Sequence, residues 1–173
     1  YSLYYQFKEA MSIYSILRAS NGDLWLGAAS PDVGLIKLGK DKSVQNSFKL
    51  ANDTLPPQRV RSVRCMMELR PGVLLVGTRN DGLVKYDEWR HEMTYYSMDE
   101  EPERRRLQNN YITSIVRDAS GNIWIGMFGG GLALYDEEKG IISIVTQESG
   151  LAENDVCAIV PDEKHNLWIS TSN

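Results

Sequence analysis

The sequence has few of the residues from which catalytic and metal sites are built. It contains two cysteines and two histidines among 173 residues. His91 and His165 fall in separate expected turns, and two isolated turn histidines do not make a metal site. Neither a paired-cysteine metal spacing nor a Gly-x-Ser-x-Gly nucleophile motif occurs. We therefore expect no catalytic residue, no metal and no cofactor in this chain. Cys65 and Cys157 lie in apolar, strand-like runs, and we expect both to be buried thiols.

The chain also lacks a long apolar run and an excess of positive charge. No run approaches the roughly 20 residues that a membrane-spanning helix needs, and the first ten residues, YSLYYQFKEA, do not read as a signal peptide. The net charge of −4 gives no sign of a nucleic-acid partner. The one charged block, DEEPERRR at 99–106, has both signs and is predicted to be a solvated loop. An apolar fraction of 42% is typical of a soluble globular domain.

What the chain does contain is an internal repeat. Four apolar anchors recur at intervals of 50, 49 and 44 residues: Trp25, Leu75, Trp124 and Trp168. A β-branched residue stands twelve positions before each anchor: Ile13, Val63, Ile112 and Val156. A glycine follows the first three anchors two positions later: Gly27, Gly77 and Gly126. Four copies in register indicate a repeat architecture rather than chance.

Each copy alternates apolar and polar residues over short runs that end in Gly, Asn, Asp or Pro, which indicates strands and hairpins. In the third copy the expected strands cover 112–117, 122–127, 132–135 and 141–146. Four antiparallel strands per repeat, with a Trp and glycines at fixed offsets, predict an all-β fold of β-propeller blades. The expected blades lie at about 12–50, 60–97, 111–146 and 155–173, the last truncated, with 1–8 a last strand of a preceding blade. The chain would thus be a partial propeller of about three whole blades plus partial ones.

The repeat assigns structural roles to its recurring residues. Each anchor Trp is expected to pack between neighbouring blades, with Leu75 filling the same position. The glycines two positions later would let neighbouring chains approach closely, and Gly34, Gly82 and Gly131 would take positive φ at turns. Asp118 and Asp162 share one offset, where they are expected to accept backbone N–H bonds of a turn. The glycines at 129–131 are not followed by a helix, so they read as architecture rather than a phosphate cradle.

The unit NYITSIVRDASGNIWIGMFGGGLALYD, which begins at Asn110, resembles the two-component regulator propeller repeat. The resemblance covers nearly the whole chain. Its departures are Leu75 for Trp, Ser170 for Gly, His165 for the turn glycine, and a longer loop, AASPDV, in the first copy. The family implies a non-catalytic, periplasmic sensor region of a hybrid two-component system that responds to glycan fragments and signals to a histidine kinase. A membrane would be reached only through segments that this chain does not contain.

An open arc of blades would expose apolar faces and unpaired strand edges. We therefore expect the isolated piece to self-associate, with two chains approximating one ring.

Propellers usually bind ligands at the channel mouth, on the face formed by the loops before the first strand and after the second strand of each blade. Residues there that vary between copies are the better candidates, because the repeat does not account for them. Arg79 and Phe128 come first, since no turn demands either. The full set expected to contact an oligosaccharide or another small ligand is Arg79, Phe128, Asn80, Asp81, Arg59, Asn110, Tyr111 and Asn154. Arg, Asn and Asp would bond sugar hydroxyls, and the aromatic rings would stack on a sugar face.

Two other functions stay open at this stage. Some propellers, such as the streptogramin lyases, are enzymes that use channel-facing His and acidic residues with a metal. A histidine on a first strand or on the loop before it would favour that class, and neither His91 nor His165 is placed there. A protein–protein interaction scaffold is the other alternative, and the sequence does not separate it from a sensor.

Overall fold

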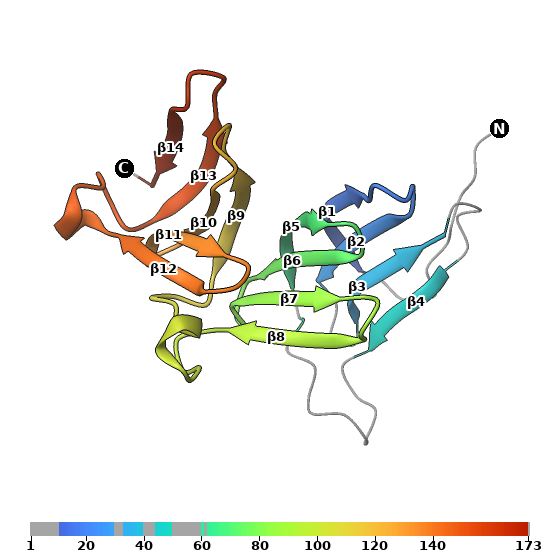
Figure 1. Cartoon of the computed structure of the whole chain (residues 1–173). Coiled ribbons are helices and arrows are strands. Elements are labelled where there is room, and N and C mark those ends of the chain that lie inside the picture. The colour runs from blue at the N-terminus through green and yellow to red at the C-terminus, as the bar shows by residue number, and fades with distance from the viewer. Residues whose placement is uncertain (1–10, 30–32, 40–43, 50–59, 61, 173) are drawn as a thin grey trace.

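The computed structural model describes residues 11–29, 33–39, 44–49, 60 and 62–172, and these form β-sheets arranged in an arc (Figure 1). Three sheets have four antiparallel strands each, in chain order from the inner to the outer edge. Their strands are β1 Ser12–Arg18, β2 Leu24–Ala29, β3 Val33–Leu38 and β4 Val44–Lys49; β5 Val63–Arg70, β6 Val73–Thr78, β7 Leu83–Asp87 and β8 Glu92–Tyr96; β9 Ile112–Arg117, β10 Ile123–Met127, β11 Gly131–Asp136 and β12 Gly140–Val145. A fourth sheet pairs β13 Val156–Pro161 with β14 Leu167–Thr171. The all-β blade architecture of a partial propeller is confirmed.

Two short 3-10 helices, Glu103–Arg105 and Gln147–Ser149, interrupt the loops between sheets. The first lies in the charged block at 99–106, which is largely exposed and pairs its own charges, Arg105 with Glu100 and Arg106 with Glu101. The solvated loop predicted there is confirmed. The lone strand expected at 1–8 falls outside the described residues.

Most of the core lies between sheets, and one further cluster, made of Leu26, Val33, Ile36 and Leu38, belongs to the first sheet alone. The first strands of successive sheets contact one another, β1 with β5, β5 with β9 and β9 with β13, so the sheets fan out from this inner row. One buried cluster joins the first and second sheets, another the second and third, and a smaller one the third and fourth. Each sheet therefore depends on its neighbour for a dry face, as expected for stacked repeats.

Close approach at three glycines sets the spacing between sheets. A Cβ at Gly77 would lie 2.6 Å from Cγ2 of Ile112, on the first strand of the next sheet, and 2.5 Å from Sγ of Cys65, its cross-strand partner. Gly27 meets Val63 and Ser15 in the same way, and Gly126 meets Val156 and Ser114. No real Cβ tolerates such distances, so each glycine is a socket for a β-branched residue of the next sheet.

The fourth copy alters both residues of this cross-strand pair. Ser or Cys faces Gly in the first three sheets, whereas Ala158 faces Ser170 in the fourth. The bulk lost from one strand appears on the other, which explains how Ser170 departs from the repeat without breaking the pairing. The turn departure has a similar account: His165 adopts φ 65°, the left-handed conformation that Gly72 and Gly121 take at the same turn.

The anchor side chains are buried where a neighbouring sheet covers them. Trp25 is 1% exposed and packs edge-on against Tyr86 of the second sheet, with ring centroids 5.9 Å apart. Leu75 is fully buried in the cluster that holds Tyr135, the counterpart of Tyr86. Trp124 is half-buried, and Trp168 is 65% exposed because no sheet packs on it in this chain. The expectation that Trp168 is buried between blades was wrong for this chain.

The two thiols also differ. Burial raises the pKa of the Cys65 thiol to about 12, and its sulfur packs against Gly77, as expected of a buried cysteine. Cys157 is exposed on β13, so the prediction of burial was wrong there. Its strand is the innermost of its sheet, and alternate residues of such a strand face the axis rather than the next sheet.

Asp118 and Asp162 organise the turns between the first two strands of the third and fourth sheets. Oδ1 of Asp118 accepts the backbone N–H groups of Ser120 and Asn122, both at 2.9 Å, so the predicted role is confirmed. Oδ2 additionally accepts the indole N–H of Trp124 at 2.9 Å. Asp162 repeats this arrangement with Trp168, at 3.1 Å. The carboxylate thus fixes both the turn and the anchor ring.

We predict that Trp25→Ala destabilises the chain far more than Trp168→Ala. Loss of a buried indole costs about 3–5 kcal/mol, whereas loss of an exposed one removes little packing and one hydrogen bond, about 1 kcal/mol. Urea unfolding of both variants, followed by far-ultraviolet circular dichroism, measures the difference. Equal losses for the two variants would contradict the burial described above.

Gly77→Ala should destabilise the chain by about 1–3 kcal/mol, because the new methyl group overpacks against Ile112 and Cys65. Adding Cys65→Ala, which imitates the small first-strand residue of the fourth sheet, should recover part of the loss. A double-mutant cycle from urea midpoints measures the coupling. Ser170→Ala is the control, since a Cβ is already accommodated there; a neutral Gly77→Ala would refute the socket.

Stability should fall between pH 4 and pH 2 through the turn aspartates. The indole N–H of Trp124, followed by the amide of Asn122, lowers the pKa of Asp118 from 3.8 to about 2, and Asn166 and Trp168 do the same for Asp162. A carboxyl with a depressed folded-state pKa contributes stability above its unfolded pKa and loses it as pH falls through the folded pKa. The Asp118→Asn, Asp162→Asn double variant should show a shallower fall in urea midpoint over this window. An unchanged slope would contradict the assignment.

Candidate functional site

The sheets present two different ends, and the candidate site lies at one of them. The turn end carries the turn between the first and second strands and the turn between the third and fourth strands. The opposite end, called the rim below, carries the loops before each first strand and after each second strand. Arg79, Tyr111 and Phe128 lie at the rim: Arg79 follows β6, Tyr111 precedes β9 and Phe128 follows β10.

The rim gathers an arginine–aromatic cluster, made of Tyr14, Arg64, Arg79, Tyr111 and Phe128. The ring of Tyr111 lies at its centre, with its centroid 5.6 Å from that of Phe128 and the two planes tilted by 35°. The guanidinium carbons of Arg79 and Arg64 lie 5.7 and 5.8 Å from the same centroid. The guanidinium carbon of Arg64 also lies over the ring of Tyr14, 4.0 Å from its centroid. Three sheets thus contribute to one surface.

Equivalent backbone bonds hold the cluster's rim positions. The N–H of Arg79 donates to the carbonyl of Ser62 at 3.1 Å, and the N–H of Phe128 donates to that of Tyr111 at 2.9 Å. Arg79 and Phe128 therefore occupy the same place in successive sheets. Their side chains take no part in these bonds, and Phe128 is 39% and Tyr14 49% exposed. The rings of Phe128 and Tyr14 and the exposed side chain of Arg79 are therefore accessible to a ligand, and Arg64 is half-buried beside them.

Asn110 and Asn154 serve the framework. Oδ1 of Asn110 accepts a hydrogen bond from the backbone N–H of Met98 at 2.9 Å. The backbone carbonyl of Asn110 accepts one from the N–H of Gly82 at 3.0 Å. Asn154 makes the same pair of bonds with Gln147 and Gly131. The side-chain oxygens offered as ligand acceptors are thus engaged, because the turn glycines and loops need them. Gly82 and Gly131 have the positive φ expected of them, 80° and 72°. The same expectation was wrong for Gly34, which lies within the extended strand β3 and has no positive φ.

The other predicted residues contribute less to the cluster. Asn80 is exposed at the rim, and Asp81 is half-buried, with its N–H donating to Oγ1 of Thr78 at 2.9 Å. Arg59 lies outside the described residues. Sequence reasoning missed Tyr14 and Arg64. The sequence does show variation at this position. Tyr14 and Arg64 each follow the β-branched residue that begins the first strand pattern of their copy, and the later copies have Thr113 and Cys157 there. Variation between copies was sought in loops and not on the first strands.

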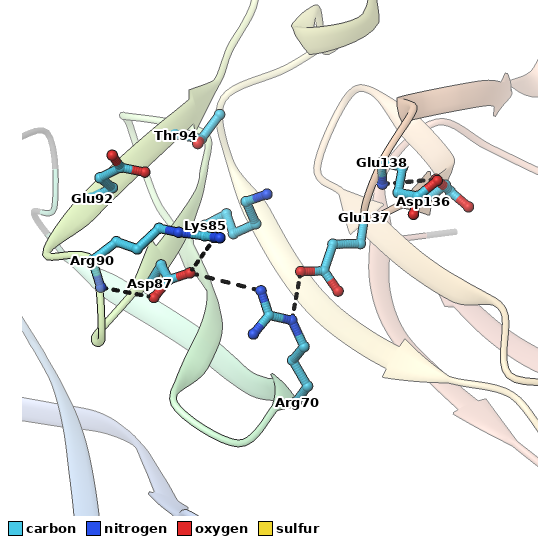
Figure 2. A pocket seen from close by; sticks show the side chains of 9 residues that line it. All are labelled: Arg70, Lys85, Asp87, Arg90, Glu92, Thr94, Asp136, Glu137 and Glu138. Carbon is cyan, nitrogen blue, oxygen red and sulfur yellow. Dashed lines mark hydrogen bonds and ion pairs between the residues drawn. The ribbon is translucent and has the colours of Figure 1, made fainter.

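A second candidate is a polar cleft at the turn end, between the second and third sheets (Figure 2). Its volume is about 580 Å³, and its lining residues are Arg70, Lys85, Asp87, Arg90, Glu92, Thr94, Asp136, Glu137 and Glu138. Figure 2 shows Arg70 reaching across it, 2.9 Å from Oε1 of Glu137 and 3.7 Å from Oδ2 of Asp87. Arg90 also pairs with Asp87, at 3.2 Å.

Three carboxylates of the cleft, those of Asp87, Asp136 and Glu137, are held by structural bonds. Partial burial opposes ionisation of Asp87, but the backbone N–H and charge of Arg90 and the N–H of Trp89 lower its pKa. Asp136 holds the equivalent turn, accepting the N–H groups of Glu138 and Lys139 at 2.9 and 2.8 Å. The Arg70–Glu137 pair also has a counterpart one sheet earlier, where Lys37 pairs with Glu88. The cleft is therefore an ion-paired seam between sheets, and it lacks an aromatic ring among its lining residues.

The described part of the chain has neither a cluster of metal-binding side chains nor a helix long enough to cross a membrane. Among those residues, no three His, Cys, Asp or Glu side chains gather in a way that could hold a metal ion. His91 and His165 lie in turns at the turn end, and Nδ1 of His165 lies 3.0 Å from the Ser120 hydroxyl. The helices in this part of the chain are too short to cross a bilayer.

Comparison with known proteins identifies the repeat. The family model described as "Two component regulator propeller" matches residues 106–129 and 150–173. No curated protein matches the chain.

Solved structures with the same fold include extracellular domains of two-component systems. The extracellular domain of a protein described as hybrid two-component system BT3049 from B. thetaiotaomicron is 23% identical, with a TM-score of 0.69 over 92% of this chain and 20% of that one. That of BT4673, from the same organism, is 22% identical, with a TM-score of 0.72 over 94% of this chain and 22% of that one. PorZ, a surface component of the type-IX secretion system of Porphyromonas gingivalis, is 19% identical, with a TM-score of 0.68 over 93% of this chain and 25% of that one. This chain spans about a fifth to a quarter of their length.

Proposed function

From the two-component regulator propeller repeats that this chain contains, we propose that it is a ligand-sensing, non-catalytic part of an extracytoplasmic sensor. The ligand is an oligosaccharide, and the site is the arginine–aromatic cluster at the rim. This chain would be part of the periplasmic region of the sensor, and ligand binding there would signal to a histidine kinase. The likeness in fold to extracellular domains of two-component systems supports the setting.

The single observation that carries the ligand proposal is the geometry around Tyr111. Its ring and that of Phe128 form a tilted pair, half-exposed, with two guanidinium groups over or beside it. Aromatic faces bind the apolar C–H faces of sugar rings, and Arg N–H groups donate to hydroxyl oxygens around the edge. The cleft in Figure 2 has no aromatic ring among its lining residues, so it suits a sugar less well.

An enzyme of the streptogramin-lyase type receives no support from the placement of the two histidines. Both lie at the turn end of the sheets, and the cluster lies at the rim. A proton-transfer catalyst has to reach its substrate within hydrogen-bond distance. We therefore propose no catalysis for this chain.

We expect titration calorimetry with a panel of plant and host oligosaccharides to find binding that depends on the rim rings. Phe128→Ala should weaken the affinity for the best ligand about tenfold, or 1.4 kcal/mol, through loss of one stacking face. Trp89→Ala is the matched control: Trp89 is 72% exposed at the turn end and should leave affinity unchanged. Absence of binding across the panel, or equal effects of the two variants, would refute the proposal.

A further inference from the structure

The cluster holds two arginines that lack acidic partners. No carboxylate in the described part of the chain pairs with Arg64 or Arg79, whereas Arg70, Arg90, Arg105 and Arg106 each pair with one. Both guanidinium groups lie within 6 Å of one ring centroid, that of Tyr111. Two like charges held on one ring repel each other unless an anion lies between or beside them. Arg18, Arg104 and Arg117 likewise have no carboxylate partner in the described residues, so what distinguishes Arg64 and Arg79 is that both guanidinium groups lie against one ring.

Arg64 has a second unmet requirement. Its Nε is buried and has no hydrogen-bond partner among the described residues, although Tyr14 lies against the guanidinium group. A buried donor without an acceptor is costly and is rare in native structures. The planar guanidinium fork matches the oxygens of a carboxylate or sulfate, which accept two parallel N–H bonds. The donor thus indicates an acceptor that comes from outside the chain.

The charge of the rim changes from the second sheet to the fourth. At the positions of Tyr111 and Phe128 the fourth sheet has Asp155 and Ser172, and the Ser172 hydroxyl donates to Asp155 at 3.1 Å and to Glu153 at 3.2 Å. The rim is therefore cationic over the second sheet and acidic over the fourth, with the aromatic pair between them. An anionic group of a ligand would be placed at the arginines and its uncharged ring at Tyr111 and Phe128.

We infer that the arginine–aromatic cluster recognises a sugar ring that carries a carboxylate or sulfate group. This inference rests on the proposed function, because it takes the ligand to be a sugar, and it narrows that class to acidic sugars. The guanidinium groups of Arg64 and Arg79 bind the anionic group, while the rings of Tyr111 and Phe128 cover the sugar face. Neutral sugars share only the second contact.

The test is a nuclear magnetic resonance titration of the full chain, following the arginine Nε–H signals and the amides of Tyr111 and Phe128. Sodium glucuronate and glucose 6-sulfate distinguish the two anionic groups, glucose is the neutral analogue, and sodium sulfate is the anion without a ring. We expect at least one acidic sugar to shift all these signals with an affinity about tenfold above that of glucose, as one charge-assisted contact provides. The difference should shrink as salt is raised.

Variants separate charge from packing. Arg64→Gln and Arg79→Gln should each bring the affinity for the acidic sugar close to that for glucose, and Arg64→Lys should retain part of the preference. Arg90→Gln is the matched control, since it removes one equally charged, exposed side chain from the cleft in Figure 2 and should change nothing. Circular dichroism melting of each variant shows whether it has folded, and the sugar titrations of wild-type protein stand without any variant.

Three other results would each contradict a different claim. Equal binding of acidic and neutral sugars at the cluster overturns the inference and leaves the proposed function intact. Sodium sulfate that shifts the arginine signals as strongly as the acidic sugars, with no response at Tyr111 or Phe128, overturns recognition of a sugar acid. If no sugar shifts any signal of the cluster, the inference is wrong and the proposed site is wrong with it.

Discussion

The contact between a glycine on the second strand of one sheet and a β-branched residue on the first strand of the next is the constraint on which this structure depends. Gly77 has no room for a methyl group because Ile112 fills that space. The same contact at Gly27 and Gly126 repeats the spacing between sheets. Close spacing lets a Trp or Leu anchor reach across to a tyrosine of the following sheet, as Trp25 reaches Tyr86. Interior packing is dense enough that a single added methyl is felt throughout such a contact.

The same repetition divides the sheets into an end that carries structure and an end that carries variation. At the turn end, Asp118 and Asp162 bind their own turns and anchor rings, and Asp87 and Asp136 hold the outer turns. These bonds use side chains, so they form only in the copies that carry the aspartate; at the offset of Asp118 the first two copies have Ala19 and Leu69. Ion pairs then tie neighbouring sheets along this end, through Lys37 and Glu88 and through Arg70 and Glu137.

Much of this could be read from the sequence because the repeat supplies four views of one unit. The glycine contacts follow from an offset that the first three copies share, and the turn aspartates follow from one that the third and fourth copies share. The strands of the third sheet follow from the alternation of apolar and polar residues within that copy. The exposure of Trp168 could not be read in this way, since it depends on a neighbouring sheet and not on the residue's own offset. Cys157 shows the same limit: an apolar run predicts a strand, and it does not say which of its faces the next sheet covers. Tyr14 and Arg64 were missed for a related reason, because their meeting with Tyr111 joins residues from three sheets.

At the rim, backbone hydrogen bonds hold the positions of Arg79 and Phe128, whereas side chains hold the turns at the turn end. The N–H of Arg79 bonds the carbonyl of Ser62, and that of Phe128 bonds the carbonyl of Tyr111, whatever the side chains are. A position held through its main chain can exchange its side chain at little cost to the fold. Successive sheets accordingly show Ser and Arg, then Tyr and Phe, then Asp and Ser at these two places. A surface assembled from such positions is where a repeat protein can acquire specificity. In the second and third sheets these positions carry Arg79, Tyr111 and Phe128 of the arginine–aromatic cluster, whereas in the fourth sheet the Ser172 hydroxyl donates to Asp155.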